Sequence, residues 1–233
     1  NVSLVQFMGK DNVPFHAVTF PATLIGTNEP FTLLEKLSTT EYLNYENGKF
    51  SKSRCTGVFG NDARDSGIPA SYWRYYLLAT RPESMDAVFS WDDFGNKCNA
   101  ELLANLGNLV NRTSKFLWSK LEGRLGSCLD PSTHAPTATL VSKVGEHLQA
   151  YAAAMDGIQL RAALKEAMAI SAAGNAYLTE SRLDGKLLEA DAEMCRSVLS
   201  TALNLVYILS ALLEPFLPSV ASDIQCILNA PAR

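Results

Sequence analysis

The sequence predicts an α/β segment followed by a larger all-α region, and two observations indicate this fold class. Near the N-terminus, the short apolar run at residues 2–7 precedes polar residues and then the apolar residues 13–24, which is the order strand, turn and buried helix. From Ser90 onward, apolar residues recur at helical spacing to the end of the chain. Because strand–turn–helix order is typical of α/β domains, and sustained helical spacing of bundles, we expect both in one chain.

The α/β segment is expected to contain a second strand and a tight turn. Residues 37–45 mix β-branched and aromatic side chains with polar ones, which favours a strand. Asn47-Gly48 follows, and this dipeptide favours a tight turn because both residues tolerate positive φ. The chain would then present residues 49–54 on a loop. A further helix is expected over about residues 70–80.

The region from residue 91 is expected to form an antiparallel helical bundle. Ser90 is placed to cap its first helix, and Asp92 and Asp93 suit the positive end of the helix dipole. Seven side chains at i, i+3 and i+4 spacing predict one stripe on this helix: Leu102, Leu103, Leu106, Leu109, Val110, Thr113 and Leu117. Further helices are expected over residues 137–155, 158–178, 189–213 and 218–229. Pro215 and Pro218 should separate the last two.

Composition excludes some classes of protein. The chain is 47% hydrophobic and 19% charged, as in globular proteins, and no apolar run reaches about 18 residues, so no membrane span is expected. Five cysteines without Cys-x-x-Cys spacing predict free thiols in a reducing, cytoplasmic compartment and no metal site. The net charge of −4 argues against a general nucleic-acid binder, although residues 105–125 carry four cations against Glu122 alone. Recognition of one folded RNA therefore stays open.

Residues 49–54 form a loop with the composition of a polyphosphate site. The sequence Lys-Phe-Ser-Lys-Ser-Arg places three cations and two hydroxyls within six residues, directly after the predicted turn. Such a loop can neutralise the charge of a departing pyrophosphate during attack on an α-phosphate, where the protein supplies mainly positioning and electrostatics. Taken alone, this composition is more often a solvated surface loop. The surrounding sequence has to decide between the two interpretations.

The surrounding sequence resembles one enzyme family. Residues 49–53 resemble the signature loop of class I aminoacyl-tRNA synthetases, usually Lys-Met-Ser-Lys-Ser, in the form seen in eukaryotic-type methionyl enzymes. Upstream, residues 7–16 resemble the segment on the fourth strand of that family's nucleotide-binding domain. Four downstream segments resemble the connector that follows the loop: residues 57–60, 72–78, 81–83 and 89–91. The resemblance covers nearly the whole chain and is strongest over about residues 5–116.

The resemblance implies the C-terminal half of a methionyl-tRNA synthetase in three parts. Residues 1–48 would end a Rossmann-like catalytic domain, residues 49–90 would hold the signature loop and a connector that contacts the tRNA stem, and residues 91–233 would form an α-helical anticodon-binding domain. The intact enzyme would activate methionine with ATP and Mg²⁺ and transfer it to tRNA-Met. The other nucleotide signature, and the zinc-carrying insertion of many relatives, would lie N-terminal to Asn1. This fragment, which lacks an initiating Met, would be inactive without that N-terminal half.

The resemblance also implies roles for individual side chains. Four residues of the loop would contact the ATP phosphates: Lys49, Ser51, Lys52 and Ser53. Lys10 and Asp11 would lie at the nucleotide and adenylate site, and His16 would line the methionine pocket. Judged without the resemblance, Lys10 and Asp11 are more simply an exposed turn pair, and His16 a helix residue with satisfied hydrogen bonds.

The helix that follows Gly107 matches the family's anticodon-reading helix. Asn108 and Arg112 are four residues apart and therefore share one face. With Asn105 and Lys115 they are expected opposite the leucine stripe, facing solvent. Asn and Arg side chains present the donors and acceptors needed to read base edges in an unstacked RNA loop. In the family these two residues contact the CAU anticodon; otherwise the pattern is that of a solvated polar face.

Two positions depart from the family pattern. Cys55 stands where the family usually has Gly, which restricts the backbone of the loop. Asp184 stands where the family has a tryptophan that stacks on an anticodon base. Tyr177 is expected to pack in the bundle and cannot replace that ring. We therefore expect a looser loop over residues 179–187, with Arg182 compensating through the RNA backbone or by planar stacking.

A rival interpretation is a non-catalytic tRNA-binding or scaffold protein that keeps the same fold. In such a protein we would expect the residues of the signature loop to be lost. All four polar residues of the loop are intact: Lys49, Ser51, Lys52 and Ser53. The sequence therefore favours the enzyme.

Overall fold

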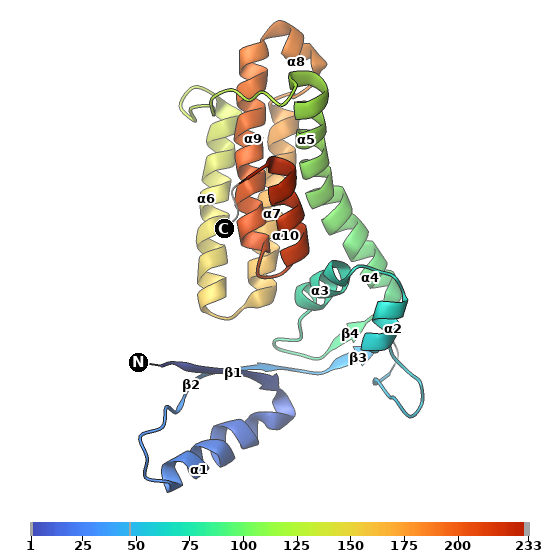
Figure 1. The fold of residues 1–233 in the computed structure, drawn as a ribbon, viewed down its shortest axis with the longest axis vertical. Helices are drawn as coiled ribbons and strands as arrows, with labels where there is room; N and C mark the ends of the chain where they lie inside the picture. Colours follow the sequence, from blue (N-terminus) through green and yellow to red (C-terminus); the bar gives the residue numbers. More distant parts are fainter. Residues whose placement is uncertain (1, 47, 231–233) are drawn as a thin grey trace.

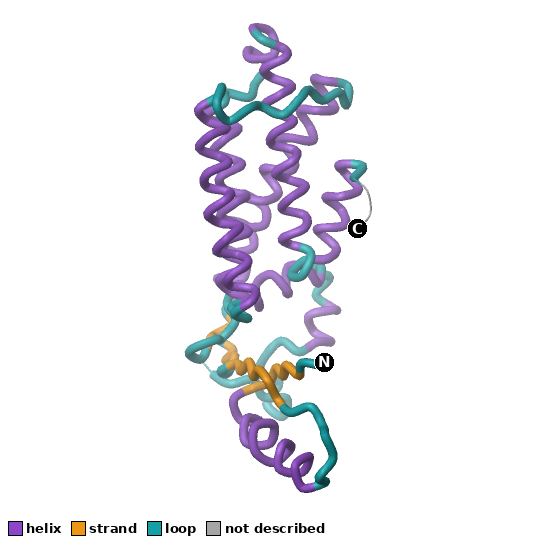
Figure 2. Tube along the Cα trace, turned by 90° about the vertical axis from the view of Figure 1, so that its left-hand side faces the viewer, coloured by secondary structure: helices purple, strands orange, loops and turns teal. Residues whose placement is uncertain are grey.

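The computed structural model describes residues 2–46 and 48–230. The molecule is elongated, with two small sheets and α1 (Phe20–Gly26) at one end and a helical bundle at the other (Figure 1). The strands gather between α1 and the bundle (Figure 2). The predicted order, a short α/β segment followed by a larger all-α region, is confirmed.

The first sheet is a parallel pair joined by a helical crossover. Strand β1 (Leu4–Gly9) pairs with β2 (Leu34–Thr40). Parallel neighbours cannot be joined by a tight turn. The connection here runs through a 3₁₀ turn at Lys10–Asn12, a π-helical turn at Phe15–Thr19 and α1. Lys10 and Asp11 therefore stand at the C-terminal end of β1, where α/β sheets bind ligands.

The helix after β1 was expected to be buried, and this expectation is wrong. Phe15 is 63% exposed, Val18 64% and Ile25 61%. The physical reason is that the π-helical turn and α1 form one continuous helix, and the described residues place no further element over its apolar face.

A second parallel pair joins residues on either side of the loop over residues 49–54. Strand β3 (Leu43–Tyr45) pairs with β4 (Ala87–Phe89), so the strand expected over residues 37–45 is divided between β2 and β3. Tyr45 and Gly48 exchange backbone hydrogen bonds of 2.7 and 2.8 Å, which closes a tight turn there, although Asn47 lies outside the described residues. Helix α3 (Ala70–Ala79) is confirmed, and the short helix α2 (Gly60–Asp65) was not expected.

Aromatic side chains hold α3 and β4 on the first helix of the bundle. Tyr76 and Phe89 are buried against Phe94, and Trp73 stacks on Phe89 with ring centroids 5.9 Å apart. The Tyr76 hydroxyl donates to Asp93 at 2.8 Å, and burial together with this carboxylate raises the pKa of Tyr76 to about 12. Residues 91–97 are thus fixed to the end of the α/β part.

The bundle contains the expected helices. Its first helix is continuous through α4 (Trp91–Lys97), a π-helical stretch at Cys98–Gly107 and α5 (Asn108–Leu121). The other members are α6 (Ala135–Asp156), α7 (Leu160–Glu180), α8 (Gly185–Ala190), α9 (Ala192–Leu213) and α10 (Pro218–Leu228). Helix α9 is long and apolar enough to cross a membrane by length and composition alone. Its most apolar window is 61% buried inside the bundle, as the central helix of a bundle must be.

Two expectations for the first helix need correction. Leu103 was placed on the buried stripe but is 63% exposed. The π-helical stretch takes more residues per turn than an α-helix, so a 3.6-residue spacing misplaces side chains along it. Ser90 occupies the N-cap position with extended backbone, but its side chain makes no capping hydrogen bond.

Candidate functional site

Lys10 and Asp11 join the end of β1 to the segment between β2 and β3. The Lys10 ammonium contacts the Glu41 carboxylate and donates to Asp86 Oδ1 at 3.1 Å. Asp11 accepts a hydrogen bond from the Tyr42 hydroxyl, and Lys10 Nζ lies 4.3 Å from the centroid of the Tyr42 ring. These contacts make a compact polar group around Tyr42.

The charges of this polar group stabilise one another. Hydrogen bonds from Lys10 to Glu41 and Asp86 raise the pKa of Lys10. The Tyr42 backbone N–H, and then Lys10, lower the pKa of Asp86. The Asp11 carboxylate raises the pKa of the Tyr42 hydroxyl. At neutral pH the group therefore holds a cationic Lys10, an ionised Asp86 and a protonated Tyr42.

The loop after the Tyr45–Gly48 turn brings Lys49 to the same group. Lys49 Nζ lies 5.8 Å from the Tyr42 ring centroid. Ser51 and Thr56 exchange backbone hydrogen bonds of 2.8 and 2.9 Å, so residues 51–56 form a tight hairpin. Lys52 Nζ lies 5.8 Å from the Phe59 ring centroid, and the cations over the Tyr42 ring among the described residues are Lys10 and Lys49.

Both hydroxyls of the loop lie on this hairpin. The Ser51 and Ser53 hydroxyl oxygens are 3.3 Å apart, and Arg54 Nε donates to Ser51 Oγ at 3.2 Å. Cys55 has a φ of +50°, in the left-handed region that favours glycine. The cysteine therefore occupies a backbone conformation that glycine adopts more easily, which strains the loop at this position.

His16 is not brought together with these residues. It lies on the π-helical turn after β1 and is half-buried. Within residues 2–46 and 48–230 its side chain makes no hydrogen bond or ion pair. The methionine role that the resemblance gives it stays a prediction.

Asn108 and Arg112 lie on α5, in the bundle, well away from the loop. Asn108 Nδ2 donates to Asn175 Oδ1 of α7 at 2.8 Å, which leaves the carbonyl oxygen of the exposed Asn108 side chain available. Arg112 is half-buried, and no described residue forms a hydrogen bond or ion pair with its side chain. A free amide acceptor and a free guanidinium four residues apart can form hydrogen bonds with the edge of a base.

Asn105 does not face solvent as expected. Its side chain donates to the Met168 carbonyl at 2.9 Å and accepts from Asn175 Nδ2 at 3.2 Å. The π-helical stretch turns Asn105 toward α7. Asn175, which sequence reasoning gave no role, thus links Asn105 and Asn108. Asn175 could have been recognised from the sequence as a polar amide on the buried face of α7, four residues from Ser171. Buried amides need hydrogen-bond partners, so such a residue is expected to contact another polar group.

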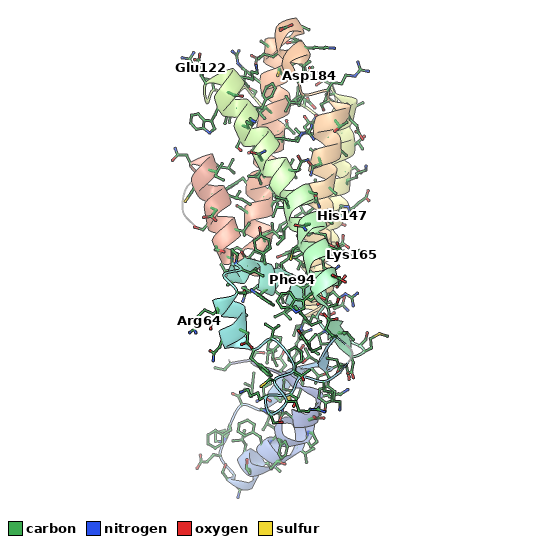
Figure 3. The ribbon with its side chains drawn as sticks, turned by 90° about the vertical axis from the view of Figure 1, so that its right-hand side faces the viewer. Arg64, Phe94, Glu122, His147, Lys165 and Asp184 are labelled. Atoms are coloured by element: carbon green, nitrogen blue, oxygen red, sulfur yellow. The ribbon has the colours of Figure 1, made fainter. Side chains whose placement is uncertain are left out.

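Asp184 has a structural role that the sequence did not show. It is the N-cap of α8, and its Oδ1 accepts from the Leu187 backbone N–H at 2.9 Å. Much of the segment expected to be a loose loop is helical, because α7 continues to Glu180 and α8 begins at Gly185. Asp184 and Glu122 mark the end of the bundle farthest from the sheets (Figure 3). Tyr177 is 1% exposed, so its expected packing in the bundle is confirmed.

The described residues offer no metal centre. No group of three or more His, Cys, Asp or Glu side chains lies close enough together within residues 2–46 and 48–230. The donors near the loop are ammonium, guanidinium and hydroxyl groups, which suit phosphate oxygens.

Comparison with known proteins agrees with the resemblance in the sequence. Residues 1–114 match the family described as tRNA synthetases class I (M), and residues 131–233 match the anticodon binding domain of methionyl tRNA ligase. The probable cytoplasmic methionine–tRNA ligase of Schizosaccharomyces pombe is 51% identical over 99% of this chain and 30% of its own length. The cytoplasmic methionine–tRNA ligase of Saccharomyces cerevisiae is 50% identical over the whole chain and 31% of its own length. The chain thus spans about 30% of the curated relatives it matches.

The fold agrees as well. A structure of Mycobacterium tuberculosis methionyl-tRNA synthetase in complex with methionyl-adenylate superposes with a TM-score of 0.86 over 97% of this chain and 44% of that protein. At 23% identity this likeness shows the fold alone. With both family matches and relatives at about half identity along its whole length, the chain belongs to the methionyl-type class I tRNA synthetases.

Proposed function

We propose that this chain is the C-terminal portion of a cytoplasmic methionine–tRNA ligase, which activates methionine with ATP and transfers it to tRNA-Met. Residues 1–48 end its Rossmann-like catalytic domain, residues 49–90 hold the signature loop and the stem-contact connector, and residues 91–233 form the anticodon-binding domain. The relatives at about 50% identity carry this name and the cytoplasmic location. ATP enters as its Mg²⁺ complex, and the N-terminal half of the enzyme supplies the rest of the active site.

One observation carries the catalytic part of the proposal. Lys10 and Lys49, which lie 39 positions apart in sequence, both lie over the Tyr42 ring, at 4.3 and 5.8 Å. Lys10 and Asp11 end a strand of a parallel pair, the usual place for a ligand in α/β folds. Together with Lys52, Ser51 and Ser53, these cations would neutralise the phosphate charge that develops as pyrophosphate leaves.

The anticodon part of the proposal rests on α5. Asn108 is held by Asn175 with its carbonyl oxygen outward, and Arg112 lies one turn further along the same helix. Both lie on α5 in the bundle, whereas the loop lies at the end of the molecule that holds the strands, so adenylate formation and anticodon recognition would use separate surfaces (Figure 1). Asp184 offers no aromatic face, so base stacking at its position is absent and Arg182 is the available planar group.

The two half-reactions of the full-length enzyme test this assignment. Lys52→Ala should lower methionine-dependent ATP–pyrophosphate exchange about 10²–10³-fold, the usual effect of losing one positioned electrostatic contact, with little change in methionine affinity. Asn108→Ala or Arg112→Ala should lower tRNA charging by roughly 10-fold or more and spare the exchange reaction, since a base contact contributes about 1–3 kcal/mol.

Three outcomes would contradict the proposal. A wild-type enzyme that binds tRNA but shows no exchange would support the non-catalytic rival. A Lys52→Ala variant changed mainly in methionine affinity would make the loop structural. Equal damage to both half-reactions by Asn108→Ala would mean that this side chain supports the fold.

A further inference from the structure

A charged pocket lies where α7 meets the first helix of the bundle. It has a volume of about 470 Å³. Its charged lining comes from both helices: Lys97, Glu101, Arg161 and Lys165. Tyr75, Leu164 and Met168 are among the residues that form its floor. Lys165 is labelled at the same end of the bundle as Phe94, opposite Asp184 (Figure 3).

The lining of this pocket carries a net positive charge. Both oxygens of Glu101 are occupied, one by Lys97 Nζ at 3.2 Å and the other by the buried Tyr75 hydroxyl. Arg161 and Lys165 are exposed and one helical turn apart, and among the described residues neither side chain has an ion-pair or hydrogen-bond partner. Three cations against one carboxylate leave the lining at +2. Two of the cations are free to bind an anion.

The pocket shares Met168 with the amide group that holds Asn108. Met168 lines the pocket, and its carbonyl accepts the Asn105 side chain. Further along the same helix pair, Asn175 of α7 binds Asn108 of α5. Lys165 and Asn175 are ten residues apart on α7, so the pocket lies about 15 Å from the Asn108 contact at about 1.5 Å per residue. That span matches a few base pairs of a nucleic-acid stem.

We propose that Arg161 and Lys165, supported by Lys97, form a binding site for backbone phosphates of the RNA stem adjoining the loop that Asn108 and Arg112 read. This inference rests on the proposed function. Phosphate contacts position an RNA without reading its sequence. The pocket therefore sets the register of the stem on the bundle, whereas α5 supplies discrimination between anticodons.

The salt dependence of tRNA binding by the full-length enzyme tests this site. Each lost phosphate contact lowers the slope of log K against log salt by about 0.7–0.9. Lys165→Gln should lower the slope by that amount, and Arg161→Gln with Lys165→Gln by roughly twice as much. Affinity at low salt should fall about two- to fivefold per charge. The loss should be equal for tRNA-Met and for the same tRNA with another anticodon.

Lys143→Gln is the matched control. Lys143 is an exposed lysine of α6, which lies across the bundle from α5 (Figure 1), and its substitution removes the same charge. Unchanged melting temperatures would show that all variants fold. Two further probes distinguish RNA backbone phosphate from a free phosphate ion. They are the anticodon stem-loop alone and inorganic phosphate at matched ionic strength.

The outcomes separate this site from the proposed function. Slopes that fall for Lys165→Gln and for the double variant with Arg161→Gln, but not for Lys143→Gln, with both tRNA and the stem-loop, support the site. Equal slopes for all three variants would overturn it. The site would also be overturned if the variants lost binding of inorganic phosphate but bound RNA as the wild type does. A wild-type enzyme that does not prefer tRNA-Met would contradict the proposed function instead.

Discussion

Leu109 and Phe15 are both large apolar residues on helices, yet Leu109 is fully buried and Phe15 is 63% exposed. The contrast extends to the regions that contain them. The bundle closes its core around α9, whereas the segment from β1 to β2 leaves the apolar face of its helix uncovered. Because exposed apolar patches mark surfaces that bind something, we expect the apolar face of the N-terminal helix to pack against a further surface, whereas the helices of the bundle supply their own core.

The largest expected effect contrasts these two residues directly. Leu109→Ala should lower the free energy of unfolding of this chain by about 2–5 kcal/mol, because it leaves a cavity where α5, α7 and α9 meet. Phe15→Ala should change it by no more than about 0.5 kcal/mol. Urea unfolding followed by circular dichroism measures both. In the full-length enzyme Phe15→Ala should become costly, and equal small effects in both contexts would break the comparison.

A smaller effect is expected at the far end of the bundle. Asp184→Ala should cost about 1 kcal/mol, because the Leu187 N–H loses its capping acceptor. Asp184→Asn keeps an acceptor and is the control. Asp184→Trp should lose the same cap even if its ring binds RNA more tightly. A thermal melt would contradict this account if Asp184→Ala were as stable as the wild type.

At the signature loop the expected effect is smaller again and has the opposite sign. Cys55→Gly should stabilise the hairpin over residues 51–56 by about 0.5–1 kcal/mol. Relief of left-handed strain contributes roughly 1–2 kcal/mol, and the freer unfolded chain opposes it by about 0.4–1 kcal/mol. Hydrogen exchange of the Ser51 and Thr56 amides reports the change. Faster exchange in the variant would show that the cysteine is not strained.

The smallest effect concerns pH. The folded pKa of Asp86 is lowered, so its contribution is present above its unfolded pKa of about 3.9 and is lost as the pH falls through the folded value. The folded pKa of Lys10 is raised, so its contribution is present below about pH 10.4 and is lost above it. The contact should therefore persist across neutral pH. A carboxyl NMR titration of Asp86, with Lys10→Gln as control, would contradict this if Asp86 titrated at its ordinary pKa.

Local periodicity was enough to predict the bundle. Helices α6, α7, α9 and α10 followed from apolar spacing and from the prolines at 215 and 218, whereas α8 was not predicted. Contacts between distant segments could not be predicted in the same way. Leu103 and Asn105 were misplaced because nothing in the local sequence marks the π-helical stretch. The helix after β1 was misjudged because its covering surface is not supplied by the described residues.

The candidate site shows the same division. The loop composition and the position of Lys10 and Asp11 after a strand were visible in the sequence. The close approach of Lys10 to Lys49 was not visible, because both contact Tyr42, which lies between β2 and β3. Asn175 and the capping role of Asp184 were missed because their partners, Asn108 and the Leu187 N–H, are fixed only by the fold.

Hydrogen–deuterium exchange across the chain tests the contrast between the two regions most directly. In residues 1–233 alone, amides of α7 and α9 should be strongly protected, and those of α1 should exchange orders of magnitude faster because no core covers them. In the full-length enzyme the amides of α1 should gain protection while those of the bundle stay unchanged. Equal protection of α1 and α9 in the isolated chain would contradict the account.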